Sequence, residues 1–239
     1  MFAEAVRAID AGDLDALRAL PERVLHERLE NGRDDYFARP YLLWFVAENP
    51  IRTGTLPANI VEITRALLDA GAEGRDYALG LVVSGRVPRD AGVQLGLIDA
   101  LVDAGADPNC LDPALAHREN AAAERLLERG ARLTLVAAAC LGRSFDAAAA
   151  TPEERQVALA GAALHGRADA LRPLIAAGVE INAFNPEGYH SHSTALHSAV
   201  DSGSAEAVEV LLDAGADRSI KDTLFHGTPD DWFQYLNRS

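Results

Sequence analysis

The sequence predicts an all-α solenoid of antiparallel helix pairs joined by short finger loops or β-hairpins. This prediction rests on a phrase that recurs along the 239 residues: two apolar residues, two variable residues, and then Gly, usually followed by Ala. The phrase occurs at Leu67–Ala72, Leu101–Asp107, Leu126–Ala131, Leu174–Glu180 and Leu211–Asp217. A supersecondary unit repeated at such intervals can bury its apolar face only against its neighbours, so the units must stack.

The last full unit, Thr194 to Gly215, has the residue pattern of two short helices. Apolar residues with helical spacing are Leu196, Ala199 and Val200, followed by Val208, Leu211 and Leu212. Gly203 is suited to cap the first helix, and Gly215 ends the second. The segment after Gly215 is polar and is predicted to be a projecting hairpin or loop.

This unit resembles the ankyrin repeat, whose units of about 33 residues have a Thr-Pro-Leu-His opening, two antiparallel helices and a β-hairpin finger. The resemblance is strongest over residues 160–232. It implies structural roles for the repeat residues Thr194, Leu196, His197, Gly203, Leu211, Leu212 and Gly215. In the family, the histidine of the opening ties helix to turn by hydrogen bonds, and His197 occupies that position.

The spacing of the phrase indicates an irregular array. Its glycines, at 71, 105, 130, 178 and 215, are separated by 34, 25, 48 and 37 residues. The 25-residue unit should have little or no finger, and the 37-residue unit contains a four-residue insertion, His190 to Ser193. In the 48-residue interval, the first helix from Leu133 to Gly142 has no clear second helix before Thr151 and Pro152 open another.

These patterns predict one domain over residues 1–239. Residues 1–21 form an N-terminal capping unit, 22–219 about five to six irregular repeats, and 220–239 a C-terminal cap. Pro40 to Ala47 resembles an opening helix, and the aromatic cluster Tyr36, Phe37, Tyr41, Trp44 and Phe45 is predicted to pack in the core. In the cap, Thr228 to Trp232 opens a further unit with Asp where the family has Leu and His. A terminal unit needs a polar outer face, and we expect this charge to prevent further stacking.

Composition limits the classes of partner. The chain has 22 Lys and Arg against 36 Asp and Glu, a formal charge of −14, which repels phosphate backbones and anionic membranes. We therefore expect neither nucleic acid nor membrane as a partner. The N-terminus lacks the basic start and apolar run of a signal peptide, and the two cysteines lack metal or redox spacing. We expect a cytoplasmic monomer without cofactors.

No phosphate loop, nucleophile elbow or catalytic pair is recognisable in the sequence. We therefore predict that the protein is not an enzyme. An enzyme would require a concave pocket with coupled titrating groups from distant segments. The resemblance implies an adaptor, inhibitor or sequestering partner. The predicted function is therefore protein recognition through the finger loops and the concave face of the first helices.

Residues on or beside the last two fingers are the candidates for partner contact. They are Phe184, Tyr189, His190, His192, Phe225, His226 and Trp232. Aromatic anchors dominate many interfaces, although these side chains could also pack finger on finger. An alternative function is metal or small-ligand binding, if stacked fingers bring His190, His192 and His226 together.

Overall fold

The computed structural model describes residues 1–47 and 54–237, and its contacts gather in two compact units. Unit 1 comprises Met1–Ala114 and Ala121–Ala131, and unit 2 comprises Leu115–Asn120 and Arg132–Ser239. The boundary between them falls within α8 (Leu111–Ala116) and α9 (Asn120–Glu128). The prediction of a single domain with caps at 1–21 and 220–239 stays a prediction, and residues 238 and 239 of that cap lie outside the described residues.

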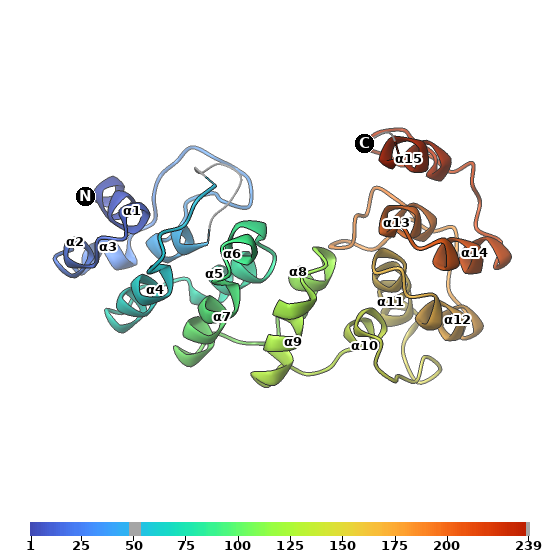
Figure 1. Ribbon diagram of the computed structural model, residues 1–239, viewed down its shortest axis with the longest axis horizontal. Helices are drawn as coiled ribbons and strands as arrows, with labels where there is room; N and C mark the ends of the chain where they lie inside the picture. The colour runs from blue at the N-terminus through green and yellow to red at the C-terminus, as the bar shows by residue number, and fades with distance from the viewer. Residues whose placement is uncertain (48–53, 238–239) are drawn as a thin grey trace. The chain divides into compact units, whose positions relative to one another are not determined.

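The helices of unit 1 pack in two layers (Figure 1). The first layer contains α1 (Phe2–Ala11), the 3-10 helix η1 (Leu42–Val46) and α5 (Arg75–Val83). The second contains α2 (Leu14–Arg18), α4 (Ile60–Asp69) and α7 (Gln94–Asp103). Each first-layer helix packs on its second-layer partner and on the next helix of its own layer. Two short helices, α3 (Arg23–His26) and α6 (Arg86–Asp90), pack on η1 and α7.

Unit 2 has the same arrangement. Its first layer runs from α10 (Leu135–Leu141) through α11 (Pro152–Leu164) and α13 (Ala195–Ser202) to α15 (Pro229–Leu236), and its second contains α12 (Ala168–Ala176) and α14 (Ala205–Asp213). In the described part of the chain, β pairing is limited to isolated bridges, one of which joins Phe184 and Thr194. The predicted all-α class and stacked helix pairs are therefore confirmed, and the fingers are loops.

The recurring phrase marks the glycine turn that ends α4, α7, α9, α12 and α14, and in four of its five copies this turn is a Schellman motif. All five glycines adopt left-handed φ values, from 87° at Gly71 and Gly178 to 99° at Gly130, which L side chains adopt only with strain. In four copies the amide after the glycine donates to the carbonyl five residues earlier. These bonds run from Ala72 to Leu67, Ala106 to Leu101, Ala131 to Leu126 and Ala216 to Leu211, at 2.9–3.0 Å. The apolar pair thus supplies both the buried face and the carbonyls that close the helix.

The irregular intervals have distinct structural causes. As expected, α10 is followed by a loop instead of a second helix, and α11 then begins at a capping box formed by Thr151 and Glu154. The 34-residue interval before Gly105 contains the short helix α6 between α5 and α7. The expected opening helix at Pro40 to Ala47 is instead the 3-10 turn η1.

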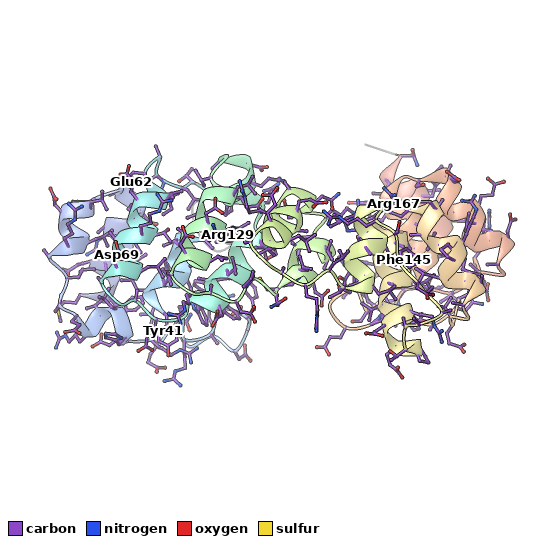
Figure 2. The ribbon with its side chains drawn as sticks, turned by 90° about the horizontal axis from the view of Figure 1, so that it is seen from below. Tyr41, Glu62, Asp69, Arg129, Phe145 and Arg167 are labelled. Atoms are coloured by element: carbon purple, nitrogen blue, oxygen red, sulfur yellow. The ribbon has the colours of Figure 1, made fainter. Side chains whose placement is uncertain are left out.

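The aromatic cluster of unit 1 is largely core, as predicted. Phe37, Trp44 and Phe45 are at most 8% exposed, whereas Tyr36 is half exposed. Tyr41, labelled in Figure 2, packs edge-on against Trp44 with ring centroids 5.9 Å apart. These aromatic contacts give η1 a packed core in place of the longer helix that the sequence pattern predicted.

The prediction that the terminal unit has a polar outer face is wrong for α15 (Pro229–Leu236). Helix α15 leaves Phe233, Tyr235 and Leu236 exposed at 59%, 76% and 42%. Asp231, counted as part of that polar face, instead accepts bonds from the amide and hydroxyl of Thr228 and so caps the helix. The charged side chains of α15 are therefore confined to its first turn, and exposed apolar side chains follow them.

Close packing of α10 on α11 depends on a missing side chain at Gly161. A Cβ built there would lie 2.8 Å from both Cys140 Sγ and Val136 Cγ2, and neither of these short, buried side chains can swing away. Gly80 is the opposite case, because a Cβ on this helical glycine of α5 would meet no atom within 4 Å.

We predict that Gly161→Ala lowers the free energy of unfolding by about 1–3 kcal/mol, because the added methyl overpacks the α10–α11 contact. Gly80→Ala is the matched control and should raise it by up to about 1 kcal/mol through helix propensity. Urea unfolding followed by far-UV circular dichroism measures both. Equal stabilisation by the two substitutions would contradict the close approach.

Candidate functional site

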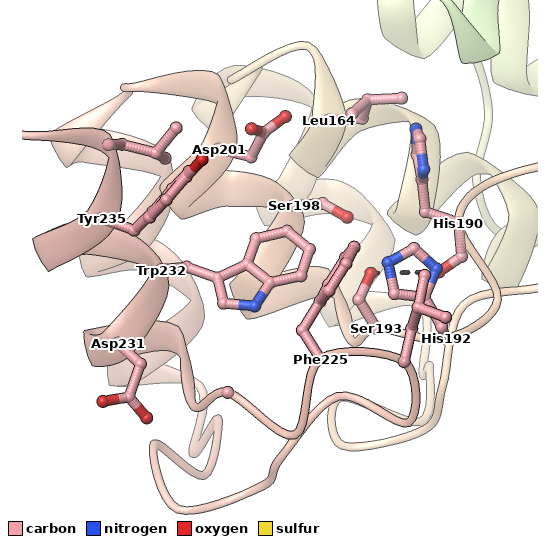
Figure 3. A pocket seen from close by; sticks show the side chains of 13 residues that line it. Leu164, His190, His192, Ser193, Ser198, Asp201, Phe225, Asp231, Trp232 and Tyr235 are labelled. Atoms are coloured by element: carbon pink, nitrogen blue, oxygen red, sulfur yellow. Dashed lines mark hydrogen bonds between the residues drawn. The ribbon is translucent and has the colours of Figure 1, made fainter. Parts of the chain in front are cut away.

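A pocket of about 710 Å³ opens in unit 2, between α13, α15 and the loops at 178–194 and 214–228. Figure 3 shows its wall, in which Trp232 lies between Phe225 and Tyr235. Besides these three side chains, the lining includes Leu164, His190, His192, Asp201, Leu224, Asp231 and Leu236. Most of this surface is apolar or aromatic, which is the character of a binding pocket.

The 178–194 loop is held to α13 by a buried amide. The backbone amide of Asn185 donates to the Ser193 carbonyl at 2.8 Å, and its side-chain Nδ2 donates to Ser198 Oγ at 2.9 Å. Ser193 Oγ in turn donates to the His190 carbonyl at 3.0 Å. Asn185, Ser193 and Ser198 are all at most 4% exposed. The inserted residues from His190 to Ser193 therefore form a fixed turn at the edge of the pocket.

The 214–228 loop is organised around the buried carboxylate of Asp222. It accepts hydrogen bonds from the amides of Leu224, Phe225 and Gly227 at 2.6–2.9 Å and from Trp232 Nε1 at 3.0 Å. Burial by itself raises the pKa of Asp222, but these donors outweigh it and lower the pKa to about 2. Asp222 is therefore ionised at neutral pH, and it fixes both the loop and the Trp232 ring.

His197 joins α13 to the next loop. Its Nδ1 accepts from the hydroxyl and amide of Thr194 at 2.9 and 3.3 Å, and its Nε2 donates to the Gly227 carbonyl at 3.1 Å. Burial lowers its pKa, so the ring is neutral at pH 7 in the tautomer that these partners define. A further bond, from the Thr223 amide to the His192 carbonyl at 2.8 Å, joins the two loops.

Aromatic contacts complete the wall. The His192 ring lies 5.8 Å from Phe225 and 6.0 Å from Trp232 between centroids, and His197 packs edge-on against Trp232 at 5.1 Å. Phe225 and Trp232 are 6.4 Å apart in a T-shaped arrangement. Trp232 is half-buried, whereas Phe225 is 70% exposed. Neighbouring rings thus hold the Trp232 ring in place, whereas the Phe225 ring is open to solvent.

The structure gathers four of the candidate residues, His190, His192, Phe225 and Trp232, at this pocket. Phe184 is 42% exposed but lies outside the pocket lining. Tyr189 was expected at the surface as a partner contact, but its side chain is buried, at 2% exposed. Its ring approaches α11 within 3.4 Å of the site where a Cβ of Gly161 would lie.

The expectation that His190, His192 and His226 come together is also wrong. The His190 and His192 rings are 5.9 Å apart, but His226 is exposed and does not line the pocket. Its backbone adopts a left-handed φ of 57° in the tight 222–227 loop, which directs the chain differently from an extended strand. Over residues 1–47 and 54–237, no three His, Cys, Asp or Glu side chains are grouped so that they could hold a metal ion.

Sequence reasoning missed Tyr235, Leu236 and Asp222. The spacing i, i+3, i+4 places side chains on one helix face, and it is the spacing of Trp232, Tyr235 and Leu236. This apolar face could therefore have been predicted from the sequence. No comparable signal marks Asp222, because its role depends on three amides of a loop whose conformation is not apparent from residue types.

The charge of the pocket is acidic. Its lining has two carboxylates, Asp201 and Asp231, and no Lys or Arg among the described residues. Asp201 forms an ion pair with Arg118. Desolvation, and then the proximity of His192, lower the pKa of His190, so this ring adds no positive charge at pH 7.

Comparison with known proteins identifies the family. A model of the ankyrin repeat, in three copies, matches residues 90–222. The chain belongs to the ankyrin repeat family. The match ends at Asp222, so the ankyrin array as matched includes the 178–194 loop, and α15 continues its first layer beyond the matched residues.

No curated protein matches this chain. Among solved structures, the human ASB11 ankyrin repeat domain is similar, with 16% sequence identity and a TM-score of 0.46, over 98% of this chain and 96% of that one. In the described residues of this ankyrin chain, every helix is too short or too polar to cross a lipid bilayer.

We predict that Asp222→Asn lowers the free energy of unfolding at pH 7 by about 2–3 kcal/mol, because an amide cannot accept all four hydrogen bonds. Since the folded-state pKa is depressed, this contribution is complete above the unfolded pKa of about 4 and is lost as the pH falls towards about 2.

Urea unfolding at pH 7, 4 and 3 should therefore show the gap between wild type and variant narrowing below pH 4. Asp213→Asn, at an exposed position at the end of α14, is the matched control and should stay within about 0.5 kcal/mol of wild type. A gap that does not change with pH would contradict the role of the Asp222 charge.

Proposed function

We propose that this ankyrin repeat protein is a non-catalytic recognition module that acts as an adaptor, inhibitor or sequestering scaffold. Its partner is another protein, bound at the pocket formed by α13, α15 and the 178–194 and 214–228 loops. Ankyrin repeats are in general protein–protein interaction modules, and the apolar lining of the pocket supports the proposal that partners bind there.

The observation that carries the proposal is a cluster of exposed apolar side chains on a rigid support. Leu224, Phe225, Tyr235 and Leu236 line the pocket and are 42–76% exposed. Burying a large apolar side chain contributes about 1.5–3 kcal/mol, and aromatic residues in such positions dominate binding energy at interfaces. Asp222 and His197 fix the loop beneath them, so little conformational entropy is lost when a partner binds.

The hydroxyl groups at the pocket support binding rather than catalysis. Ser193 Oγ donates to the His190 carbonyl, and Ser198 Oγ accepts from Asn185. Both therefore serve the loop framework, and neither is paired with a general base as nucleophilic catalysis requires.

We further propose that the chain acts as a monomer in the cytoplasm. Its two cysteines, Cys110 and Cys140, are not joined in a disulfide, which suits a reducing compartment. Burial raises the pKa of Cys110 to about 11, so its thiol is unreactive at neutral pH.

We predict that Phe225→Ala and Tyr235→Ala each weaken partner capture by at least about tenfold, because each removes an exposed aromatic anchor from the pocket. Immobilised full-length chain is incubated with native lysate, and retained proteins are quantified by mass spectrometry against the wild type. Both residues are largely exposed, so the variants should fold, which circular dichroism verifies.

Phe233→Ala is the matched control. Phe233 is an exposed aromatic residue of the same helix as Tyr235, 59% exposed, but it does not line the pocket. Loss of partners in this control alone, or retention of every partner by both pocket variants, would place recognition elsewhere on the chain.

A further inference from the structure

The aromatic pocket of unit 2 has the chemistry of a site for a cationic side chain. Phe225, Trp232 and Tyr235 contribute three aromatic rings to one pocket of about 710 Å³ (Figure 3). The face of an aromatic ring carries partial negative charge, so it attracts a guanidinium or ammonium group placed over it. An apolar partner side chain would use the same area, and the charge of the surroundings distinguishes between the two.

That charge is strongly negative. Residues 178–237 contain ten Asp and Glu against two basic residues, Arg218 and Lys221, and no basic residue lines the pocket in the described chain. Arg218 is itself paired with Asp230, at 3.6 Å. Such a field favours a cationic ligand and opposes an acidic one.

The buried carboxylate of Asp222 strengthens this effect at the central ring. It accepts the indole Nε1–H of Trp232 at 3.0 Å and is itself 1% exposed. A charge-assisted bond at the ring edge polarises the indole and increases electron density over its face. Asp231, exposed at the pocket rim, adds a second carboxylate that solvent and a partner can reach.

Unit 1 of the same chain contains a contact between a guanidinium and aromatic rings. The Arg28 guanidinium lies 5.1 Å from the centroid of the Tyr41 ring and 5.5 Å from that of Trp44. A guanidinium held by two aromatic rings is thus part of this structure, and the unit 2 pocket has a third ring with no guanidinium against it among the described contacts.

We propose, building on the recognition function above, that the pocket binds a basic segment of another protein through a cationic side chain, with arginine preferred. The planar guanidinium stacks on Phe225, Trp232 and Tyr235, while apolar neighbours in the segment cover Leu224 and Leu236. A second copy of this chain is a poorer occupant, because two molecules of charge −14 repel each other.

The test uses the purified full-length chain and a random dodecapeptide phage library, with counter-selection on the Tyr235→Ala variant. The selected peptides should share an arginine or lysine flanked by apolar residues. The best peptide is synthesised with a fluorescent label, together with a version that has citrulline, the neutral isostere of arginine, in place of that arginine, or glutamine in place of a lysine.

Fluorescence anisotropy should show at least about tenfold weaker binding for the neutral peptide and for Tyr235→Ala, with Phe233→Ala within about twofold of wild type. Equal affinity of the charged and neutral peptides, or selection of acidic peptides, would overturn the proposal. So would sedimentation showing a dimer that Tyr235→Ala dissociates, which would identify a second copy as the occupant.

The two proposals fail in different ways. Selected peptides that lack a cation but still require Phe225 and Tyr235 would refute the cationic ligand and leave the recognition surface intact. Capture of lysate partners that is indifferent to both substitutions would refute the surface itself.

Discussion

The hydrogen-bonded glycine turn that ends α4, α7, α9, α12 and α14 is the constraint on which the rest of this structure depends. A helix of nine or ten residues is marginal by itself and leaves its last carbonyls without partners. The turn satisfies these carbonyls locally, at Leu67, Leu101, Leu126 and Leu211, and directs the chain out of the helix towards the next one. Since α4, α7, α9, α12 and α14 all end in this way, the layers persist although the connecting segments vary in length.

Polar side chains, rather than β-strands, fix the loops to these helix layers. The 178–194 and 214–228 loops have little β pairing in the described chain, yet a few buried groups hold their backbones. Asn185 and Asp222 each bind several partners within or beside one loop, and His197 connects α13 to the next loop. Buried polar groups in low dielectric must be satisfied, so each of them allows very few loop conformations.

The site combines two properties that are separate elsewhere on the chain. Along the chain, 36 Asp and Glu outnumber 22 Lys and Arg, whereas the pocket presents aromatic rings that water solvates poorly. The acidic surroundings discourage non-specific association of these rings with other acidic proteins. The proposed cationic ligand would therefore be selected by electrostatic repulsion of acidic competitors as well as by attraction.

Local interactions decided the features that the sequence predicted well. The Leu-Leu-x-x-Gly-Ala phrase specifies a helix end because its bonds span at most five residues, and Thr151 with Glu154 specifies the start of α11 in the same way. The helix pairs, the missing second helix after α10 and the repeat family were all readable from such patterns. They require no knowledge of distant residues.

Tertiary structure alone decided which side chains reach the surface. Tyr189 is buried against α11 near Gly161, and His226 lies outside the pocket lining, in the loop whose three amides donate to Asp222. The apolar side chains of α15 stay exposed because α13 and the 214–228 loop cover only part of that helix. Each outcome depends on contacts between residues distant in the chain or on a loop conformation that periodicity does not encode. The sequence by itself therefore determined the repeat, and the packing of repeats determined the candidate site.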